Sequence, residues 1–426
     1  MLNRTVAPLR HDIQDMSLIQ PEKHVFDNGL KVFIFRTPKQ ELVKAEFIFR
    51  NIFDGSENSL IHTCLSHMLK EGTKTRTSKQ IAEEIDFYGA YLMPEYSFDH
   101  TALTLYSLNK HLGAVLPVVH DILNHATFPA SELKTYIRNN KQTLRISLQK
   151  NDYVARRLFF KNMFGETRYA VIPTEEAYDH LKREDLFDLY QKQIQPKNCT
   201  LLLSGNITDA VLQEIRTLFN GHAQHNSMEN ELSTPDFPAY VPTRVLEERT
   251  EALQSAIRLG VPSVNRVHPD FPAVQFVNTL LGGYFGSRLM RNIREEKGFT
   301  YSIGSAFASL QHTGFFTIAT EVGVDNTQAT LTEIEKEFNI LRETQPSAHE
   351  MALVKNYILG SILGSVESIF SHADKFKGVY FYGLDLSYYT RYSEVVRNMT
   401  AADVQSIANQ YFNYDDLLKI VVGKMS

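Results

Sequence analysis

The sequence predicts an α+β protein with two homologous domains, each a mainly antiparallel sheet with helices packed on one face. Its 426 residues are enough for two to three domains, each with a sizeable core. Expected strands are joined by hairpins and expected helices follow one another in runs, which favours α+β over alternating βαβ units. Two segments of equal length, one in each half, also repeat the same helix-to-strand pattern.

The first predicted element is a β-hairpin. Asn28-Gly29 is the strongest two-residue turn signal, and apolar residues flank it over 24–26 and 30–35. A third strand is expected over 43–49 after a polar turn, and a fourth over 102–108. Strands connected in this way favour a mainly antiparallel sheet.

Helices are expected between and after these strands. The first lies within 59–73 and ends at Gly72-Thr73. Thr77 and Gln80 have the spacing of a capping box, so a second helix should begin there. Long helical stretches then run from 110 to about 164.

The repeated pattern is found in segments 183–205 and 401–423. Each runs from an amphipathic helix through a polar break into an apolar strand, and these strands end at Gly205 and Gly423. Few identities survive between the two segments. Their matched length nevertheless favours a duplicated domain.

A linker is predicted between the halves. The segment after residue 222 is polar, contains proline and lacks apolar periodicity, which is typical of a linker. We therefore predict one domain over 1–222, a linker over 223–240 and a second domain over 241–426.

Composition narrows the function classes. The net charge of -5 gives no electrostatic basis for binding nucleic acid. Two cysteines, Cys64 and Cys199, cannot form a disulfide framework and favour a reducing compartment. Residues 1–10 lack the apolar core of a signal peptide, and no apolar run is long enough to span a membrane. A cytoplasmic protein is the expectation.

The segment 59–73 has the frame of an inverted zinc motif, H-x-x-E-H, but lacks most of its chemistry. Thr63 occupies the position of the first ligand and Ser66 that of the general base, so only His67 remains. A catalytic zinc needs three protein ligands and an open position for water. We therefore predict that this chain binds no metal.

A residual metal site is one alternative for the same helix. Cys64 and His67 are three residues apart, and Glu71 lies four beyond His67, so their side chains can converge. The simpler interpretation is that Cys64 is a small buried apolar residue and the other two are polar groups at a helix end. Both interpretations stay open at this point.

The whole chain resembles the insulinase/pitrilysin family of inverted-motif zinc peptidases, in its small two-domain subunit form. The resemblance extends over nearly all of the sequence. Beside the helix it is carried by 24–32, 197–205, 400–404 and 420–423. The most specific element is 286–302, which is similar to the arginine-tyrosine element of the family and places the pair at Arg294 and Tyr301.

The resemblance also implies where a third zinc ligand would stand, on a later helix. The corresponding region, 133–151, contains no aspartate or glutamate. It carries instead four basic residues on one helix face: Lys134, Arg138, Lys141 and Arg145. These cations either form a solvated face or occupy the space that the metal has left.

Local signals around Arg294 and Tyr301 agree with the resemblance. Ser287 is positioned to cap a helix that runs through Lys297, and a strand is expected over 299–307 with Tyr301 near its start. The resemblance implies that both side chains donate hydrogen bonds to a peptide carbonyl and stabilise the oxyanion. A surface ion pair and an ordinary strand aromatic are the alternatives.

In the family, some members divide the zinc site and the Arg-Tyr pair between two subunits. The resemblance therefore implies a non-catalytic subunit of a heterodimeric metallopeptidase, with zinc and the general base supplied by a homologous partner and a peptide as substrate. The turn containing Gly282, Gly283 and Gly286 is similar to a substrate-handling loop of such subunits. Alternatives are a structural or assembly protein, a peptide-binding protein without hydrolysis, and a homodimer.

Overall fold

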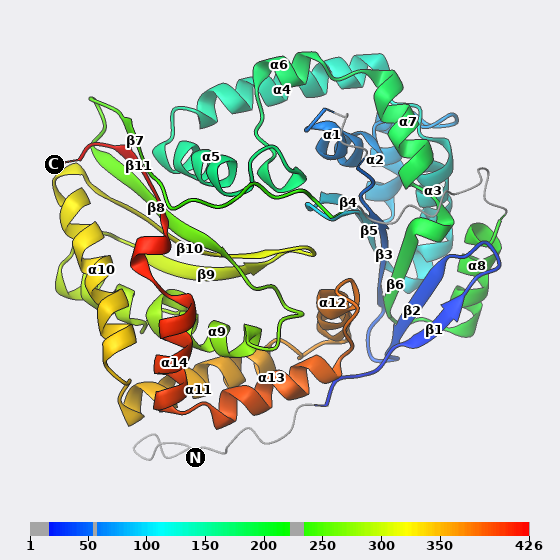
Figure 1. Cartoon of the computed structure of the whole chain (residues 1–426). Coiled ribbons are helices and arrows are strands. Elements are labelled where there is room, and N and C mark those ends of the chain that lie inside the picture. The colour runs from blue at the N-terminus through cyan, green and yellow to red at the C-terminus, as the bar shows by residue number, and fades with distance from the viewer. Residues whose placement is uncertain (1–16, 54–57, 222–233, 426) are drawn as a thin grey trace, which may run out of the picture.

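The computed structural model describes residues 17–53, 58–221 and 234–425, which form two sheets flanked by helices (Figure 1). The first sheet has the order β1 (Glu22–Val25), β2 (Lys31–Arg36), β6 (Cys199–Gly205), β3 (Leu42–Arg50), β5 (His100–Leu108), β4 (Tyr91–Tyr96). The second has the order β7 (Arg244–Glu248), β11 (Leu418–Gly423), β8 (Gln254–Ser263), β10 (Gly314–Gly323), β9 (Ile303–Ser309). The α+β prediction is confirmed.

The two sheets share one topology. Strand β6 pairs in parallel with β2 and antiparallel with β3, and β11 pairs in the same way with β7 and β8. The preceding helices α7 (Arg183–Gln193) and α14 (Ala401–Tyr411) also correspond. Gly205 and Gly423 end these strands with φ of 116° and 142°, in the region that favours glycine. The predicted repeat of 183–205 and 401–423 is thus present as structure.

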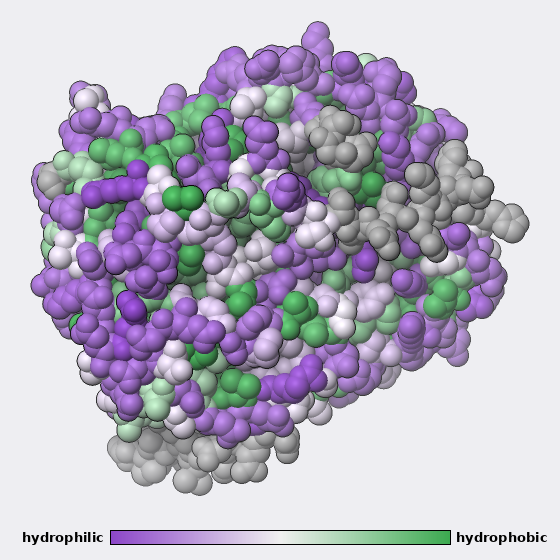
Figure 2. Space-filling model, viewed as in Figure 1, coloured by the Kyte–Doolittle hydropathy of each residue, from purple (hydrophilic) through white to green (hydrophobic). Residues whose placement is uncertain are grey.

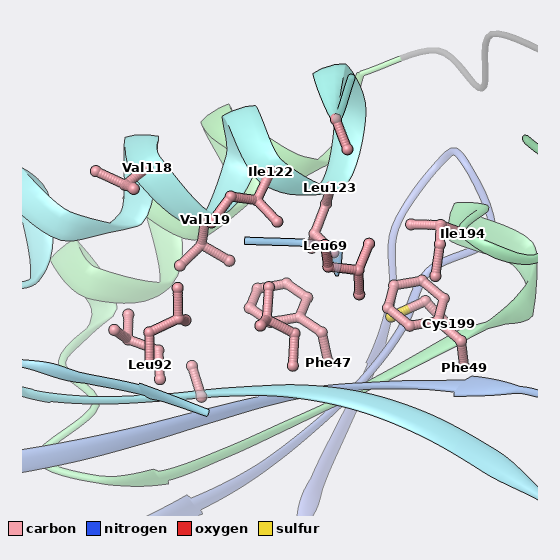
Figure 3. Packing of buried hydrophobic residues seen from close by; sticks show 14 of the residues in the cluster. Phe47, Phe49, Leu69, Leu92, Val118, Val119, Ile122, Leu123, Ile194 and Cys199 are labelled. Carbon is pink, nitrogen blue, oxygen red and sulfur yellow. The ribbon is translucent and has the colours of Figure 1, made fainter. Parts of the chain in front are cut away.

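Most helices of the N-terminal half cover one face of the first sheet. They are α1 (Ile61–Met68), α2 (Ser78–Phe87), α3 (Leu112–His125), α4 (Ala130–Ser147), α6 (Glu175–Asp179), α7 and α8 (Asp209–Phe219). The capping box predicted at Thr77 and Gln80 is present at the start of α2. Phe47, Leu65 and Val119 belong to the core between sheet and helices, part of which Figure 3 shows.

The C-terminal half repeats this arrangement. Its sheet packs against α9 (Phe271–Asn278), α10 (Thr327–Glu343), α11 (Ala348–Gly364), α13 (Ser387–Asn398) and α14. Ile257, Phe338 and Val421 are buried in this second core. Within the described residues, no helix is long and apolar enough to cross a membrane.

One helix from each half packs against the sheet of the other half. Helix α12 (Ile369–Tyr380) covers the second face of the first sheet, where the rings of Phe33 and Phe376 lie 4.7 Å apart. Helix α5 (Asn151–Phe164) covers the second face of the second sheet through Phe159 and Phe315, with ring centroids 6.0 Å apart. Both sheets are therefore covered on both faces.

A charged cluster accompanies the contact of α12 with the first sheet. Lys44 Nζ lies 3.1 Å from Glu46 and 2.8 Å from Asp374, and Lys377 Nζ lies 2.5 Å from Glu46. Burial opposes the charge on Lys44, but the two carboxylates outweigh it and raise its pKa. The four charges thus satisfy one another across the two halves.

The predicted linker, 223–240, falls largely outside the described residues, which resume at 234. From there to residue 243 the chain forms neither helix nor strand. Tyr240 anchors it by donating hydrogen bonds to the carbonyls of Gly260 and Asp416, at 3.2 Å and 2.7 Å. The domain boundaries at 222 and 241 stay predictions.

Candidate functional site

The degenerate motif lies on the short helix α1 in the N-terminal half. Ser66 is buried, Thr63 is half-buried and His67 is the exposed member of the three. The His67 ring packs against Tyr136 of α4, with centroids 4.9 Å apart, and its Nε2 lies 3.9 Å from Glu71. Partial burial of the imidazole lowers the pKa of His67. An aromatic ring therefore stands beside the one remaining histidine.

The side chains around α1 do not fit zinc. Only His67 is retained of the ligands and base that the motif requires, and Cys64 is fully buried. Burial raises the pKa of the Cys64 thiol to about 12, so it does not supply a thiolate at neutral pH. Among the residues that the structure describes, no group of three or more His, Cys, Asp or Glu side chains is placed to hold a metal ion.

The cationic face of α4 pairs with acidic residues on α6. Lys141 Nζ lies 2.7 Å from Asp179, and Arg145 Nη2 lies 2.5 Å from Glu175. The salt bridges are at least partly solvent-exposed, in agreement with a solvated face. Tyr136, rather than one of these two cations, occupies the space beside His67.

A buried aspartate organises the loop that follows α1. Asp121 of α3 accepts hydrogen bonds from Thr73 Oγ1 at 2.5 Å, Thr75 Oγ1 at 2.6 Å and Arg76 Nη1 at 2.9 Å. It also contacts His125 Nδ1 at 3.0 Å. Burial opposes the charge, yet these hydrogen bonds outweigh it and lower the pKa of Asp121 to about 2. No local pattern indicated Asp121, because it lies 45 to 48 residues from this loop in sequence.

The second candidate site, in the C-terminal half, differs locally from its prediction. Arg294 lies in a π-helix, η5 (Met290–Glu296), instead of a regular α-helix, and the Lys297 N–H bonds the carbonyl of Asn292. The predicted cap at Ser287 is wrong, because its buried hydroxyl has no hydrogen-bond partner among the described residues. Strand β9 begins at Ile303, so Tyr301 precedes the strand rather than standing inside it.

The side chains of Arg294 and Tyr301 lie in contact. The guanidinium carbon of Arg294 lies 5.1 Å from the centroid of the Tyr301 ring and 4.7 Å from that of Phe285. Two aromatic rings thus contact one planar cation. Tyr301 is 86% exposed and Phe285 is 62% exposed, so the cluster projects into solvent. Phe285 was not predicted, although an aromatic residue inside a glycine-rich turn was an available signal.

The backbone beneath this cluster is held by buried polar contacts. Arg288 Nε donates to Glu350 at 3.0 Å, and Glu350 also closes the capping box of α11. Asn292 Nδ2 donates to Glu333 at 2.9 Å and to Glu337 at 2.8 Å on α10. The exposed aromatic-cation cluster therefore stands on a firmly anchored π-helix.

The glycines of the proposed substrate loop have different surroundings. Gly282 and Gly283 lie in a second π-helix, η4 (Thr279–Gly283), and only Gly286 lies in the turn that follows. A Cβ at Gly282 would approach Ser305 Oγ to 2.5 Å and Ser305 N to 2.8 Å. Gly282 thus permits a close packing of η4 on β9, and the expected loop is shorter than predicted.

The two candidate sites stand in different halves of the molecule (Figure 1). Figure 2 shows one face of the protein as largely hydrophilic, with apolar residues scattered over it. Chemically, the C-terminal cluster offers guanidinium N–H groups and a phenolic hydroxyl, which donate hydrogen bonds to a carbonyl or an anion. The N-terminal motif offers His67 with Glu71 nearby, and Ser66 stands where the motif has its glutamate base.

Comparison with known families gives two matches. Residues 57–170 match the insulinase family, peptidase family M16, and residues 180–358 match the peptidase M16 inactive domain. An uncharacterized zinc protease, YmxG of Bacillus subtilis, is 25% identical over 94% of this chain and 98% of its own length. The non-peptidase homolog YmxG of Helicobacter pylori is 24% identical over 84% of this chain and 83% of its own length.

Similar proteins also include members of larger assemblies. Subunit 1 of the rat mitochondrial cytochrome b-c1 complex is 22% identical over 63% of this chain and 56% of its own length. Among solved structures, a peptidase M16 inactive domain from Pseudomonas fluorescens has a TM-score of 0.84 at 21% identity, covering 96% of this chain and 99% of its own. The periplasmic protease PqqL of Escherichia coli has a TM-score of 0.77 at 15% identity, covering 99% and 49%.

Proposed function

The chain belongs to the insulinase family of peptidases, M16, and from this premise we propose that it is the non-catalytic subunit of a heterodimeric metallopeptidase. Its partner is a homologous subunit that carries the zinc ion and the general base. This chain contributes Arg294 and Tyr301, which bind the substrate peptide and polarise its scissile carbonyl.

One observation carries this proposal above the others. Arg294 is half-buried between two exposed rings, on a backbone fixed by Arg288 and Asn292. Such a cation is preorganised to donate hydrogen bonds to charge that develops on a carbonyl oxygen. Nothing in the fold requires Tyr301 to be 86% exposed, whereas a surface that faces a peptide explains it. Because the side chains around α1 do not fit zinc, the proposal assigns the zinc ion to the partner.

The proposal is tested by reconstitution. The purified chain is expected to contain no stoichiometric zinc and to cleave no peptide, as measured by metal analysis and a fluorogenic peptide library. Adding a homologue with an intact H-x-x-E-H motif should produce chelator-sensitive cleavage. Stoichiometric zinc together with cleavage by the isolated chain would refute the proposal.

A structural or assembly role is the second candidate. It is favoured by the similarity to a cytochrome b-c1 subunit, whose name places it in a mitochondrial complex. In that case Arg294→Ala and Tyr301→Phe should leave complex formation and function unchanged. A peptide-binding role without hydrolysis predicts instead that peptides bind but are not turned over in the presence of the zinc-bearing homologue.

Assembly and location complete the proposal. We propose that the heterodimer is cytoplasmic, because a chain with two cysteines suits a reducing compartment. Cell fractionation with an antibody to the chain tests the location, and the E. coli relative shows that the fold also occurs in a periplasmic protease. Light scattering of the purified chain, alone and with its homologue, separates heterodimer from homodimer.

A further inference from the structure

A second kind of site lies inside the N-terminal half. A cavity of about 290 Å³ separates strands β3 and β6 from the C-terminal ends of α3, α7 and α8. Figure 3 shows part of its wall, where Phe49, Ile194 and Cys199 lie close together between the sheet and a helix. Neither the α1 motif nor the Arg294 cluster contributes to its lining. The cavity is therefore independent of the proposed peptidase role.

The inner wall of the cavity is apolar and rich in aromatic rings. Its side chains include Phe47, Phe49, Phe187, Tyr190, Ile194 and Phe219. The Tyr190 hydroxyl donates to the Leu123 carbonyl at 2.8 Å, so this polar group is already satisfied. Burial raises the pKa of the Cys199 thiol, which stays neutral. The wall thus offers an apolar surface for an alkyl or aryl group.

The mouth of the cavity is polar, and its described lining carries basic side chains without acidic ones. Among the described residues that line the cavity there are amides, histidines and one lysine, but no aspartate or glutamate. Carbonyl acceptors at the helix ends are already used: Asn28 Nδ2 donates to Phe219 O at 2.7 Å and to Gly221 O at 2.9 Å. Lys74 and His125 contribute basic groups to the lining. The mouth therefore favours an acidic head group.

Asp121 fixes the tautomer of the His125 imidazole. It is ionised above about pH 2 and lies 3.0 Å from His125 Nδ1, so this nitrogen carries the proton. The His125 imidazole is thereby held in one orientation. With the proton on Nδ1, the other nitrogen of the neutral ring accepts rather than donates, so the exposed Lys74 ammonium is the group that holds an anionic head group.

We propose that this cavity binds a small amphipathic carboxylic acid, with its hydrocarbon body against the aromatic wall and its carboxylate at Lys74. The volume of about 290 Å³ fits about ten non-hydrogen atoms, taking about 30 Å³ per water-sized group. Decanoate fits with its carbon chain inside the cavity and its two carboxylate oxygens at the mouth, and it serves as the probe.

The absence of tryptophan from the sequence makes a clean test possible. Phe187→Trp places a single fluorophore in the cavity wall at a partly exposed position. Titration with decanoate below its micelle concentration should give a saturable fluorescence change. Decanol, which has the same chain without the charge, should bind about tenfold more weakly, since a charge-assisted hydrogen bond is lost. Decyltrimethylammonium should not bind measurably.

Three variants serve as controls. Phe87→Trp places the fluorophore on α2, where Phe87 is 82% exposed and does not line the cavity, and it should show no saturable change. Lys74→Ala in the Phe187→Trp background should weaken decanoate but not decanol. Cys199→Leu fills part of the wall and should abolish binding of both.

The thermal unfolding midpoint of the unmodified chain provides a second measurement that needs no variant. Decanoate should raise it more than decanol does at equal concentration, because only a ligand of the folded state stabilises it. Equal effects of decanoate, decanol and the cationic amphiphile would overturn the proposal. So would an equal response of Phe87→Trp, or the absence of both a fluorescence change and a thermal shift.

Discussion

The two halves share one sheet topology but expose different chemistry. In the N-terminal half, the motif helix α1 buries Ser66 and packs His67 against Tyr136. In the C-terminal half, the π-helix η5 projects Arg294 between two exposed aromatic rings. The same architecture therefore surrounds one helix whose side chains do not fit zinc and another that presents an exposed cation. The exposed Arg294 cluster is therefore the first place to test for function.

The largest effect should come from removing the exposed cation. Arg294→Ala should lower the catalytic efficiency of the reconstituted complex by about 100-fold, because an oxyanion donor is lost. Steady-state kinetics with the zinc-bearing homologue measure it. Arg291→Ala, three residues earlier on the same π-helix, is the matched control and should change the rate less than about threefold. Equal activity of the two variants would show that Arg294 has no special role in the reaction.

Stability of the N-terminal half should depend on Asp121. Its pKa in the folded protein, about 2, lies below the ordinary value of 3.8. A depressed carboxyl pKa stabilises the fold above the unfolded pKa, and this contribution disappears as the pH falls towards 2. Asp121→Asn should therefore cost about 2 kcal/mol at neutral pH and flatten the loss of stability between pH 4 and 2.

Urea unfolding at a series of pH values measures this effect. Asp179→Asn removes a carboxylate from an exposed ion pair with Lys141, and it is the control with an expected cost below about 1 kcal/mol. If both variants lose the same stability, Asp121 does not organise the loop after α1.

A smaller effect is expected at Phe285. Phe285→Leu removes one of the two rings that contact Arg294 and should lower peptide turnover by about three- to tenfold, with little change in unfolding midpoint. Phe285→Tyr keeps the ring and should restore the rate. The reaction of Arg294 with phenylglyoxal, followed by peptide mapping, should be faster in Phe285→Leu. An unchanged labelling rate would show that Phe285 does not hold the guanidinium.

The smallest effect should come from the remaining histidine of the degenerate motif. The His67 side chain is 53% exposed, and His67→Ala should change the free energy of unfolding by less than about 0.5 kcal/mol. The metal content of the chain should stay the same, as measured by mass spectrometry. Loss of bound metal in this variant would restore the alternative of a residual site with Cys64 and Glu71.

Local patterns predicted much of this fold, and long-range packing determined what they missed. The Asn28-Gly29 turn and the Thr77 cap depend on neighbouring residues, so both are visible in sequence. The π-helices depend on how η4 packs against β9 and how Asn292 contacts α10, which no local pattern records. Strand β4 was likewise missed, and it contains Pro94, a residue depleted in strands.

In the candidate sites, too, local sequence predicted some contacts and long-range packing determined the others. Arg294 and Tyr301 are close in sequence, so their proximity followed from a short segment. Asp121 and the loop it binds are separated by 45 to 48 residues and meet only through the packing of α3. The contact of α12 with the first sheet joins residues that are farther apart still, such as Lys44 and Asp374, which are 330 residues apart. Periodicity identifies a buried helix face without naming the sheet that buries it.

The exchange of α5 and α12 has a consequence for how the protein is made. Lys44 and its partner Asp374 are 330 residues apart, so the first sheet leaves the ribosome long before α12 is synthesised. Until then the apolar face that contains Phe33 and Phe35 has no cover. The nascent chain should therefore be a substrate for chaperones that bind apolar segments, and it should become resistant to protease only after its last helices have emerged.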